Sequence, residues 1–367
     1  MKLWQILLVV ALGVGYGLIS PGRLAYAFGH ATLYVFLPAL LFEAAWNLHY
    51  RAILRRWIAI ATLAGPGVIL TALIVAGALA IVRVPLGPAL LAGAILSATD
   101  PIAVVAVFRG LRVPKSLVTI VECESLFNDA VAVALYRGVL VVLALGTASA
   151  GAIAMAALDS VAAAAGGTAL GVAVAFVVAR ILRGRGDVPL QIAATVLCAY
   201  GAYFAADYLR VSGIFATIAC GIALRYYERS WITLRIAEDV DRFWDLAALA
   251  ANVLVFFMVG AALRIGRVVE EPVFVGACIA AIAIARIVVA GLLVPCRYPP
   301  EWIAVVRAAG MRGALSLALA LAIPASIPYR EAIVDATFAV ALATLVASGI
   351  TLPRTARRVT LRQTPSG

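Results

Sequence analysis

The sequence divides into a series of apolar runs, most about 20 residues long, that are separated by short links carrying Arg, Gly or Pro. The hydrocarbon core of a bilayer takes about 20 apolar residues per helix. Hydrophobic residues make up 65% of the chain, whereas a soluble domain has about 45 to 50%, so this chain cannot cover an aqueous surface. We therefore expect about twelve membrane spans: 3–19, 31–48, 57–82, 87–108, 117–143, 152–179, 190–208, 212–224, 243–263, 272–295, 302–323 and 332–352.

The runs favour helices over strands. Every backbone polar group must be paired inside lipid, which leaves helical bundles and closed barrels as solutions. Barrel strands are short and alternate apolar with polar residues, whereas these runs are continuous and rich in Ala, Leu and Val. The fold class is predicted to be all-α, a polytopic membrane protein whose residues 1–367 form a single transmembrane domain.

Basic residues are placed unevenly along this chain of formal net charge +11. Most Lys and Arg fall in alternate links, such as those that contain Arg55, Arg112, Arg183 and Arg357. Positive links face the cytoplasm, so the alternation predicts two cytoplasmic termini and argues against nucleic acid as a partner. Arg greatly outnumbers Lys and Ala is abundant, which indicates a GC-rich bacterial genome and hence the cell (plasma or inner) membrane.

Cysteine and histidine are placed unfavourably for catalysis or metal binding. The five cysteines have no paired spacing, and the two histidines, His30 and His49, fall near the ends of runs. An intramembrane Ser/His hydrolase or a His-ligated metal centre needs imidazole at membrane depth. We expect a protein that is not an enzyme and has no cofactor.

Six ionisable residues lie deep inside the runs: Glu43, Asp100, Glu124, Asp129, Arg286 and Arg312. An ionisable side chain at membrane depth costs at least about 2.5 to 3.5 kcal/mol on insertion scales, so each of them is a functional hypothesis. Their number argues against a purely structural membrane subunit.

Two runs carry helix breakers at comparable depth. Asp100 precedes Pro101, which removes a helical hydrogen bond and disfavours helical geometry at the residue before it. Gly310 and Gly313 flank Arg312 in a run that crosses the membrane in the opposite direction. Two interrupted helices in antiparallel halves indicate an inverted-repeat transporter, in which half-helix ends coordinate ions near the midplane.

Four polar residues between 124 and 129 lie on two faces of one predicted helix. Ser125 and Asp129 share one face, and Glu124 and Asn128 share the other. We interpret the first face as an ion site and the second as structural. A buried Glu124 requires a buried cationic partner, and Arg286 and Arg312 are the two deep possibilities.

Several motifs resemble the monovalent cation:proton antiporter-1 family, its NhaP-type bacterial sodium/proton exchangers in particular. They are LPALLFE at 37–43, ATDP at 98–101, ECESLFNDAV at 122–131, VSGI at 211–214, FFMVG at 256–260, ARI at 285–287 and GMRGALS at 310–316. Relatives commonly have a further helix ahead of 3–19 and a long cytoplasmic tail. Here 353–367 is predicted to be a short cytoplasmic tail without a large regulatory domain.

The resemblance implies a sodium site in which Asp129 is the carboxylate for which cation and proton compete. Thr99, Ser125 and Glu43 would complete the oxygen shell, with Asp100 close by in the crossing of the broken helices. The core ion-binding helices would lie near 87–146 and 272–323, and the other helices would form the scaffold of a homodimer.

Four further residues receive supporting roles from the same resemblance. Asn128 would hold the unwound segment and, as Asn before Asp129, suggests electroneutral exchange. Glu124 would pair with Arg286, and Arg312 would offset helix dipoles and nearby carboxylates. The alternatives are a potassium/proton antiporter, a cation channel or uniporter, and a membrane enzyme such as an intramembrane protease. For the protease, no buried Ser/His pair is found.

Overall fold

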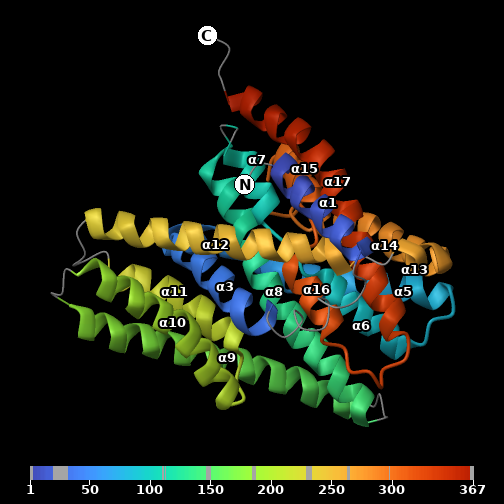
Figure 1. The fold of residues 1–367 in the computed structure, drawn as a ribbon, viewed down its shortest axis with the longest axis horizontal. Helices are drawn as coiled ribbons and strands as arrows, with labels where there is room; N and C mark the ends of the chain where they lie inside the picture. The colour runs from blue at the N-terminus through green and yellow to red at the C-terminus, as the bar shows by residue number, and fades with distance from the viewer. Residues whose placement is uncertain are drawn as a thin grey trace. The chain divides into compact units, whose positions relative to one another are not determined.

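A computed structural model describes residues 3–19, 32–109, 111, 113–145, 150–183, 187–228, 234–262, 265–296 and 298–363. Over these ranges the regular structure is helical and contains no strand, which confirms the predicted fold class (Figure 1). Among the described residues, seven helical stretches are long and apolar enough to cross a bilayer, judged by length and composition: Tyr50–Ile81, Lys115–Ala144, Gly151–Leu182, Val188–Tyr208, Ile236–Ala261, Pro272–Gly291 and Arg330–Thr360.

The chain folds into two compact units. Unit 1 comprises Met1–Thr32, Arg55–Leu145 and Val253–Gly367, and unit 2 comprises Leu33–Leu54 and Gly146–Asn252. The division falls within η1 (Thr32–Phe36, a short π-helix), α4 (Tyr50–Ala64) and α12 (Leu234–Ala262). Apart from residue 146, the two stretches predicted to hold the ion-binding helices belong to unit 1.

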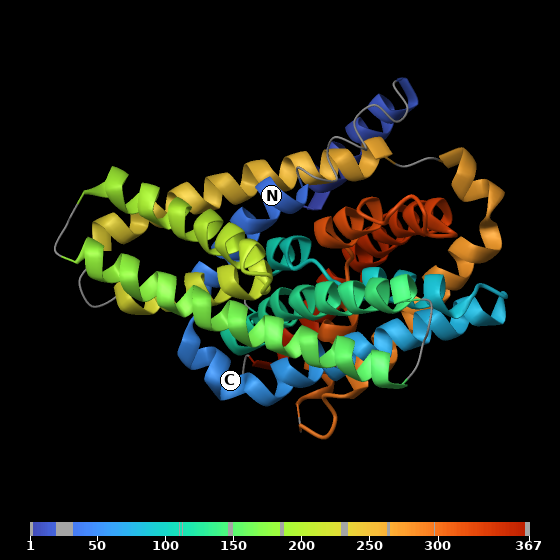
Figure 2. The ribbon, with the colours of Figure 1, turned by 90° about the horizontal axis from the view of Figure 1, so that it is seen from below.

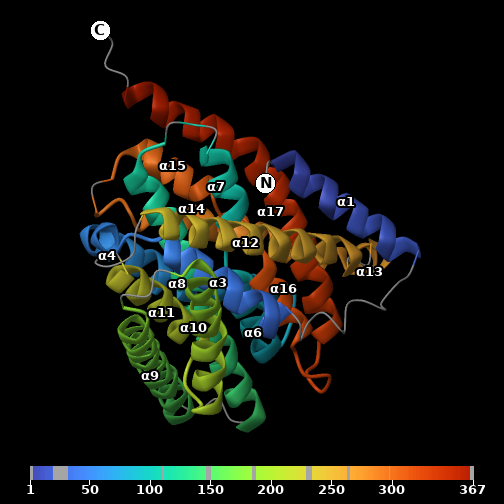
Figure 3. The same cartoon turned by 60° about the vertical axis from the view of Figure 1, so that its left-hand side comes forward.

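The described part of unit 1 contains ten further helices. They are α1 (Leu3–Ile19), α5 (Pro66–Ile81), α6 (Leu86–Ser97), α7 (Ile102–Arg109), α8 (Lys115–Leu145), α13 (Ile265–Glu270), α14 (Pro272–Gly291), α15 (Pro300–Ala308), α16 (Ala314–Leu321) and α17 (Arg330–Gln363). Helix α6 packs against α5, α8 and α16, and α17 packs against α14, α15 and α16 (Figure 3).

The two predicted breaks are present in unit 1. Helix α6 ends at Ser97, where Ala98 turns to an extended conformation with ψ 141°, and α7 starts only after Pro101. Helix α15 ends at Ala308, and α16 starts at Ala314 after the extended Gly313. Pro101 and the glycines around Arg312 thus interrupt each run where the sequence indicated.

Unit 2 is built around α11 (Gly213–Glu228), which packs against α9 (Ala150–Leu182), α10 (Val188–Tyr208) and α3 (Leu37–Asn47) (Figures 1 and 2). Small residues bring α9 and α11 together, since a Cβ placed at Gly171 would lie 2.9 Å from the carbonyl carbon of Ala216. Close backbone approach through small residues is the usual packing mode of membrane helices. Phe42, Trp46 and Trp244 fill the core beside them.

The largest differences from the predicted boundaries are at the start of α12 and the end of α17. Helix α12 starts at Leu234, nine residues before the predicted span at 243, because polar residues such as Asp241 continue the helix beyond its apolar part. Helix α17 continues to Gln363 through Pro353, into the predicted tail. Leu352, Ala356 and Val359 are buried on one face of this extension and hold it against the rest of unit 1.

Candidate ion-binding site

The extended segments at the two helix breaks meet directly. The backbone N–H of Asp100 donates a hydrogen bond to the carbonyl of Met311, with a nitrogen to oxygen distance of 2.8 Å. Each broken helix leaves such groups without a helical partner, and an unpaired backbone group is costly in a buried place. The crossing therefore satisfies part of the backbone that the breaks release.

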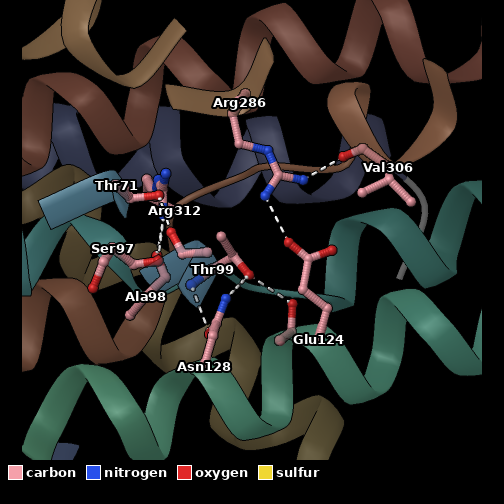
Figure 4. A network of polar contacts seen from close by, with 11 residues as sticks. Thr71, Ser97, Ala98, Thr99, Glu124, Asn128, Arg286, Val306 and Arg312 are labelled. Atoms are coloured by element: carbon pink, nitrogen blue, oxygen red, sulfur yellow. Dashed lines mark hydrogen bonds and ion pairs between the residues drawn. The ribbon is translucent and has the colours of Figure 1, made fainter. Parts of the chain in front are cut away.

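Helix α8 clamps the first break through an amide and a hydroxyl. The Asn128 side chain accepts from the backbone N–H of Thr99 at 3.3 Å and donates to Thr99 Oγ1 at 2.6 Å (Figure 4). Thr99 Oγ1 also shares a hydrogen bond of 2.9 Å with Ser125 Oγ. All three residues are buried. Asn128 thus bonds to the extended segment through both the backbone and the side chain of Thr99, and two hydroxyl oxygens lie together beside it.

The side chain of Arg312, a residue of the second break, reaches the C-terminal end of α6. Its Nη1 donates to the carbonyls of Ser97 at 2.6 Å and Ala98 at 2.9 Å (Figure 4). A helix carries partial negative charge at its C-terminus, and a cation there is stabilising. Thr344 Oγ1 accepts the backbone N–H of Arg312 at 3.1 Å and so holds the arginine in place. That Arg312 offsets a helix dipole and nearby carboxylates stays a prediction.

Arg286 is the partner of Glu124. Arg286 Nη1 donates to Glu124 Oε1 at 2.7 Å, and Nη2 donates to the carbonyl of Val306 (Figure 4). Both charged side chains are buried. The residues alone had left Arg286 and Arg312 open as partners, and the structure distinguishes them, because Arg312 is engaged with α6 instead.

Asp129 lies on α8, one helical turn after Ser125. Its side chain is half-buried, and among the described residues no donor bonds to its buried Oδ1. Asp100 and Arg312 lie close enough for their charges to act on it. Unit 1 therefore brings together Thr99, Asp100, Ser125, Asn128, Asp129 and Arg312. Carboxylate, hydroxyl and carbonyl oxygens at the ends of half-helices form the kind of site that binds a small cation.

Glu43 belongs to unit 2. It lies on α3, where Asn47 Nδ2 donates to its Oε1 at 2.7 Å. Its predicted participation in the oxygen shell remains a prediction.

Two polar residues of unit 1 were missed as site components. Ser316 Oγ donates to the carbonyl of Ala98 at 3.3 Å, and Thr344 supports Arg312. No local signal in the sequence marks Ser316 or Thr344, because both act across long separations in the chain.

Known proteins are similar to this chain in sequence and in fold. A family model described as sodium/hydrogen exchanger, transmembrane, matches residues 2–358. The chain is 34% identical over 332 residues to the low-affinity Na(+)/H(+) antiporter NhaS1 of Synechocystis sp.. This match covers 86% of this chain and 62% of that protein. It is 32% identical over 360 residues to the Na(+)/H(+) antiporter ApNhaP of Aphanothece halophytica, covering 94% and 68%. The chain thus spans less than two thirds of the length of NhaS1.

A solved structure has the same fold. The sodium proton antiporter MjNhaP1 from Methanocaldococcus jannaschii at pH 8 matches with a TM-score of 0.79 at 21% identity, covering 97% of this chain and 92% of that chain.

Proposed function

Because the chain belongs to the sodium/hydrogen exchanger family, we propose that it exchanges Na⁺, or a similar monovalent cation, for H⁺ across the cell membrane. The observation that carries the proposal is the Asp129 carboxylate beside the crossing of two broken helices, since the residues that the structure describes provide no donor to its buried Oδ1. Such a carboxylate can be neutralised by a proton or by a cation, and the two compete for it.

The surrounding residues supply the rest of a cation site. Ser125 and Thr99 offer hydroxyl oxygens, and Glu43 is proposed to add a further oxygen to the shell. Asn128 holds the segment that carries Thr99, so the oxygens do not have to be ordered when the ion arrives. This preorganisation reduces the free energy that the cation would otherwise lose in ordering the site.

Competition at one carboxylate is sufficient for coupled exchange. A bare charge is costly to move through a low-dielectric interior, whereas a site occupied by Na⁺ or H⁺ is neutralised and can change the side to which it is open. We propose that this exchange is electroneutral, that both termini are cytoplasmic, and that the protein acts as a homodimer without enzymatic activity.

Purified protein in proteoliposomes tests the proposal. An outward proton gradient should drive Na⁺ uptake, and Na⁺ should drive proton movement in return. Asp129→Asn should abolish exchange while leaving the protein folded. The control is Asp159→Asn, the same change at an exposed position of α9, which should exchange at the parental rate.

The outcomes separate the alternatives. Exchange by Asp129→Asn at the parental rate would refute the assignment of the ion site. Cation flux without a coupled proton flux would identify a channel or uniporter. Preference for K⁺ over Na⁺ at equal concentration would identify a potassium/proton antiporter, and dependence of the rate on an imposed voltage would exclude electroneutral exchange.

A further inference from the structure

The two glycines that flank Arg312 each face a charged side chain from another helix. A Cβ placed at Gly310 would lie 2.7 Å from Cζ of Arg286, and a Cβ placed at Gly313 would lie 2.5 Å from Cγ of Asp100. Real Cβ atoms essentially never approach other atoms this closely. By contrast, nothing lies within 4 Å of a Cβ placed at Gly276 on α14. The flanking glycines thus leave space for specific charged groups.

Position 313 requires glycine because Asp100 occupies the place of a side chain, and not because of the backbone conformation. The residue is extended, with φ −138° and ψ −152°. A negative φ in the extended region is open to residues that have a side chain. An alanine at this position would therefore keep the backbone conformation but collide with Asp100.

We infer that Gly313 is a positioning residue of the ion site, because its missing side chain fixes where the Asp100 carboxylate lies. This inference rests on the proposed function, to which it adds a residue that contacts no ion. The overlap of a Cβ at 313 includes Cβ of Asp100 as well as its carboxylate, so a rotation of the side chain alone does not relieve it.

The backbone of Asp100 has little freedom to yield. Its N–H is bonded to Met311, the preceding Thr99 is held by Asn128 and Ser125, and the following Pro101 restricts its conformation. A side chain at 313 must therefore displace Asp100 or separate the two crossing segments. Either change alters the charge that acts on Asp129.

The two glycines should differ in what they control. Gly310 makes room for Arg286, which pairs with Glu124 and is held by Val306. A side chain at 310 disturbs that ion pair, and hence stability. A side chain at 313 disturbs Asp100, and hence cation affinity.

Gly313→Ala, Gly310→Ala and the control Gly276→Ala separate these effects in proteoliposomes. Groups that support metal ligands typically change affinity by about 10- to 100-fold when they are altered. Gly313→Ala should raise the apparent KM for Na⁺ by about 10-fold or more while the maximal rate per folded transporter stays within about 2-fold. Gly310→Ala should lower the melting temperature and leave the apparent KM for Na⁺ at the parental value. Gly276→Ala should change neither the melting temperature nor the KM.

A folded Gly313→Ala protein with the parental KM would overturn the inference. If Gly313→Ala does not fold, the double variant Gly313→Ala with Asp100→Gly should fold, because it lacks the Asp100 Cβ and carboxylate that the alanine would overlap. Failure of the double variant to fold would also overturn the inference. Exchange by the parental protein tests the proposed function separately. Should the parent not exchange, Na⁺-induced thermal stabilisation in detergent still compares cation affinity between the parent and Gly313→Ala.

Discussion

Replacing Glu124 by Gln would show how much the buried ion pair with Arg286 contributes to stability. Arg286 is 8% exposed and Glu124 is 3% exposed, with a charge-assisted hydrogen bond of 2.7 Å between them. Gln keeps the shape and an accepting oxygen but removes the negative charge. Arg286 would then remain as a buried charge whose other bond goes to the neutral carbonyl of Val306.

Breaking a buried pair on one side costs about 3 to 5 kcal/mol, because an uncompensated charge remains in a low-dielectric place. We expect a value near 3 kcal/mol, since Gln retains the hydrogen bond. At about 1.4 kcal/mol per power of ten, this corresponds to roughly a hundred-fold change in the ratio of folded to unfolded protein. The double variant Glu124→Gln with Arg286→Met removes both charges and should regain most of the loss.

The assay is the fraction of monodisperse protein that survives heating in detergent, together with exchange in proteoliposomes. Glu271→Gln, the same change at an exposed position, is the control and should stay within about 0.5 kcal/mol of the parent. A Glu124→Gln protein as stable as the parent would refute the reasoning. A folded double variant that does not exchange would show that the pair takes part in transport.

Two further variants test the clamp and a buried acid of unit 2. Asn128→Ala should destabilise by about 1 to 3 kcal/mol in a melting assay, because it removes both hydrogen bonds to Thr99. Burial raises the pKa of Glu228, which lies beyond the apolar run 212–224, from 4.5 to about 8. The folded protein thus holds a proton that the unfolded chain has lost between these values, so stability falls as pH rises through them, by at most about 5 kcal/mol. Melting temperatures from about pH 5 to 9 should decline more steeply for the parent than for Glu228→Gln.

The breaks and the polar faces of α8 could be predicted from the sequence because their causes are local. Pro101 cannot donate a helical hydrogen bond wherever the rest of the chain lies. The spacing from Ser125 to Asp129 also follows from helical geometry alone. These local rules identified the segments that unit 1 brings together.

Pairings between distant segments could not be predicted in the same way. Sequence rules establish that Glu124 needs a cation, but Arg286 is 162 residues away and Arg312 is equally deep. The choice depends on packing, because Gly310 leaves room for Arg286, whereas Arg312 reaches the end of α6. Thr344 was missed for the same reason. Its hydroxyl has a role only because α17 passes the second break.

The charges that unit 1 holds at the crossing support the proposed exchange of one monovalent cation for one proton. Glu124 and Arg286 neutralise each other, so Asp100, Asp129 and Arg312 are the charged side chains of unit 1 that remain beside the crossing. One arginine cannot neutralise two carboxylates, and Arg312 Nη1 is already directed at the carbonyls of α6. One Na⁺ or one H⁺ supplies the missing positive charge and makes the sum over these three side chains neutral. A divalent cation would leave an excess charge that is costly to carry across a membrane, and the empty site would carry the opposite excess. The same electrostatic cost thus accounts for both the stoichiometry and the requirement that the site be occupied when it changes sides.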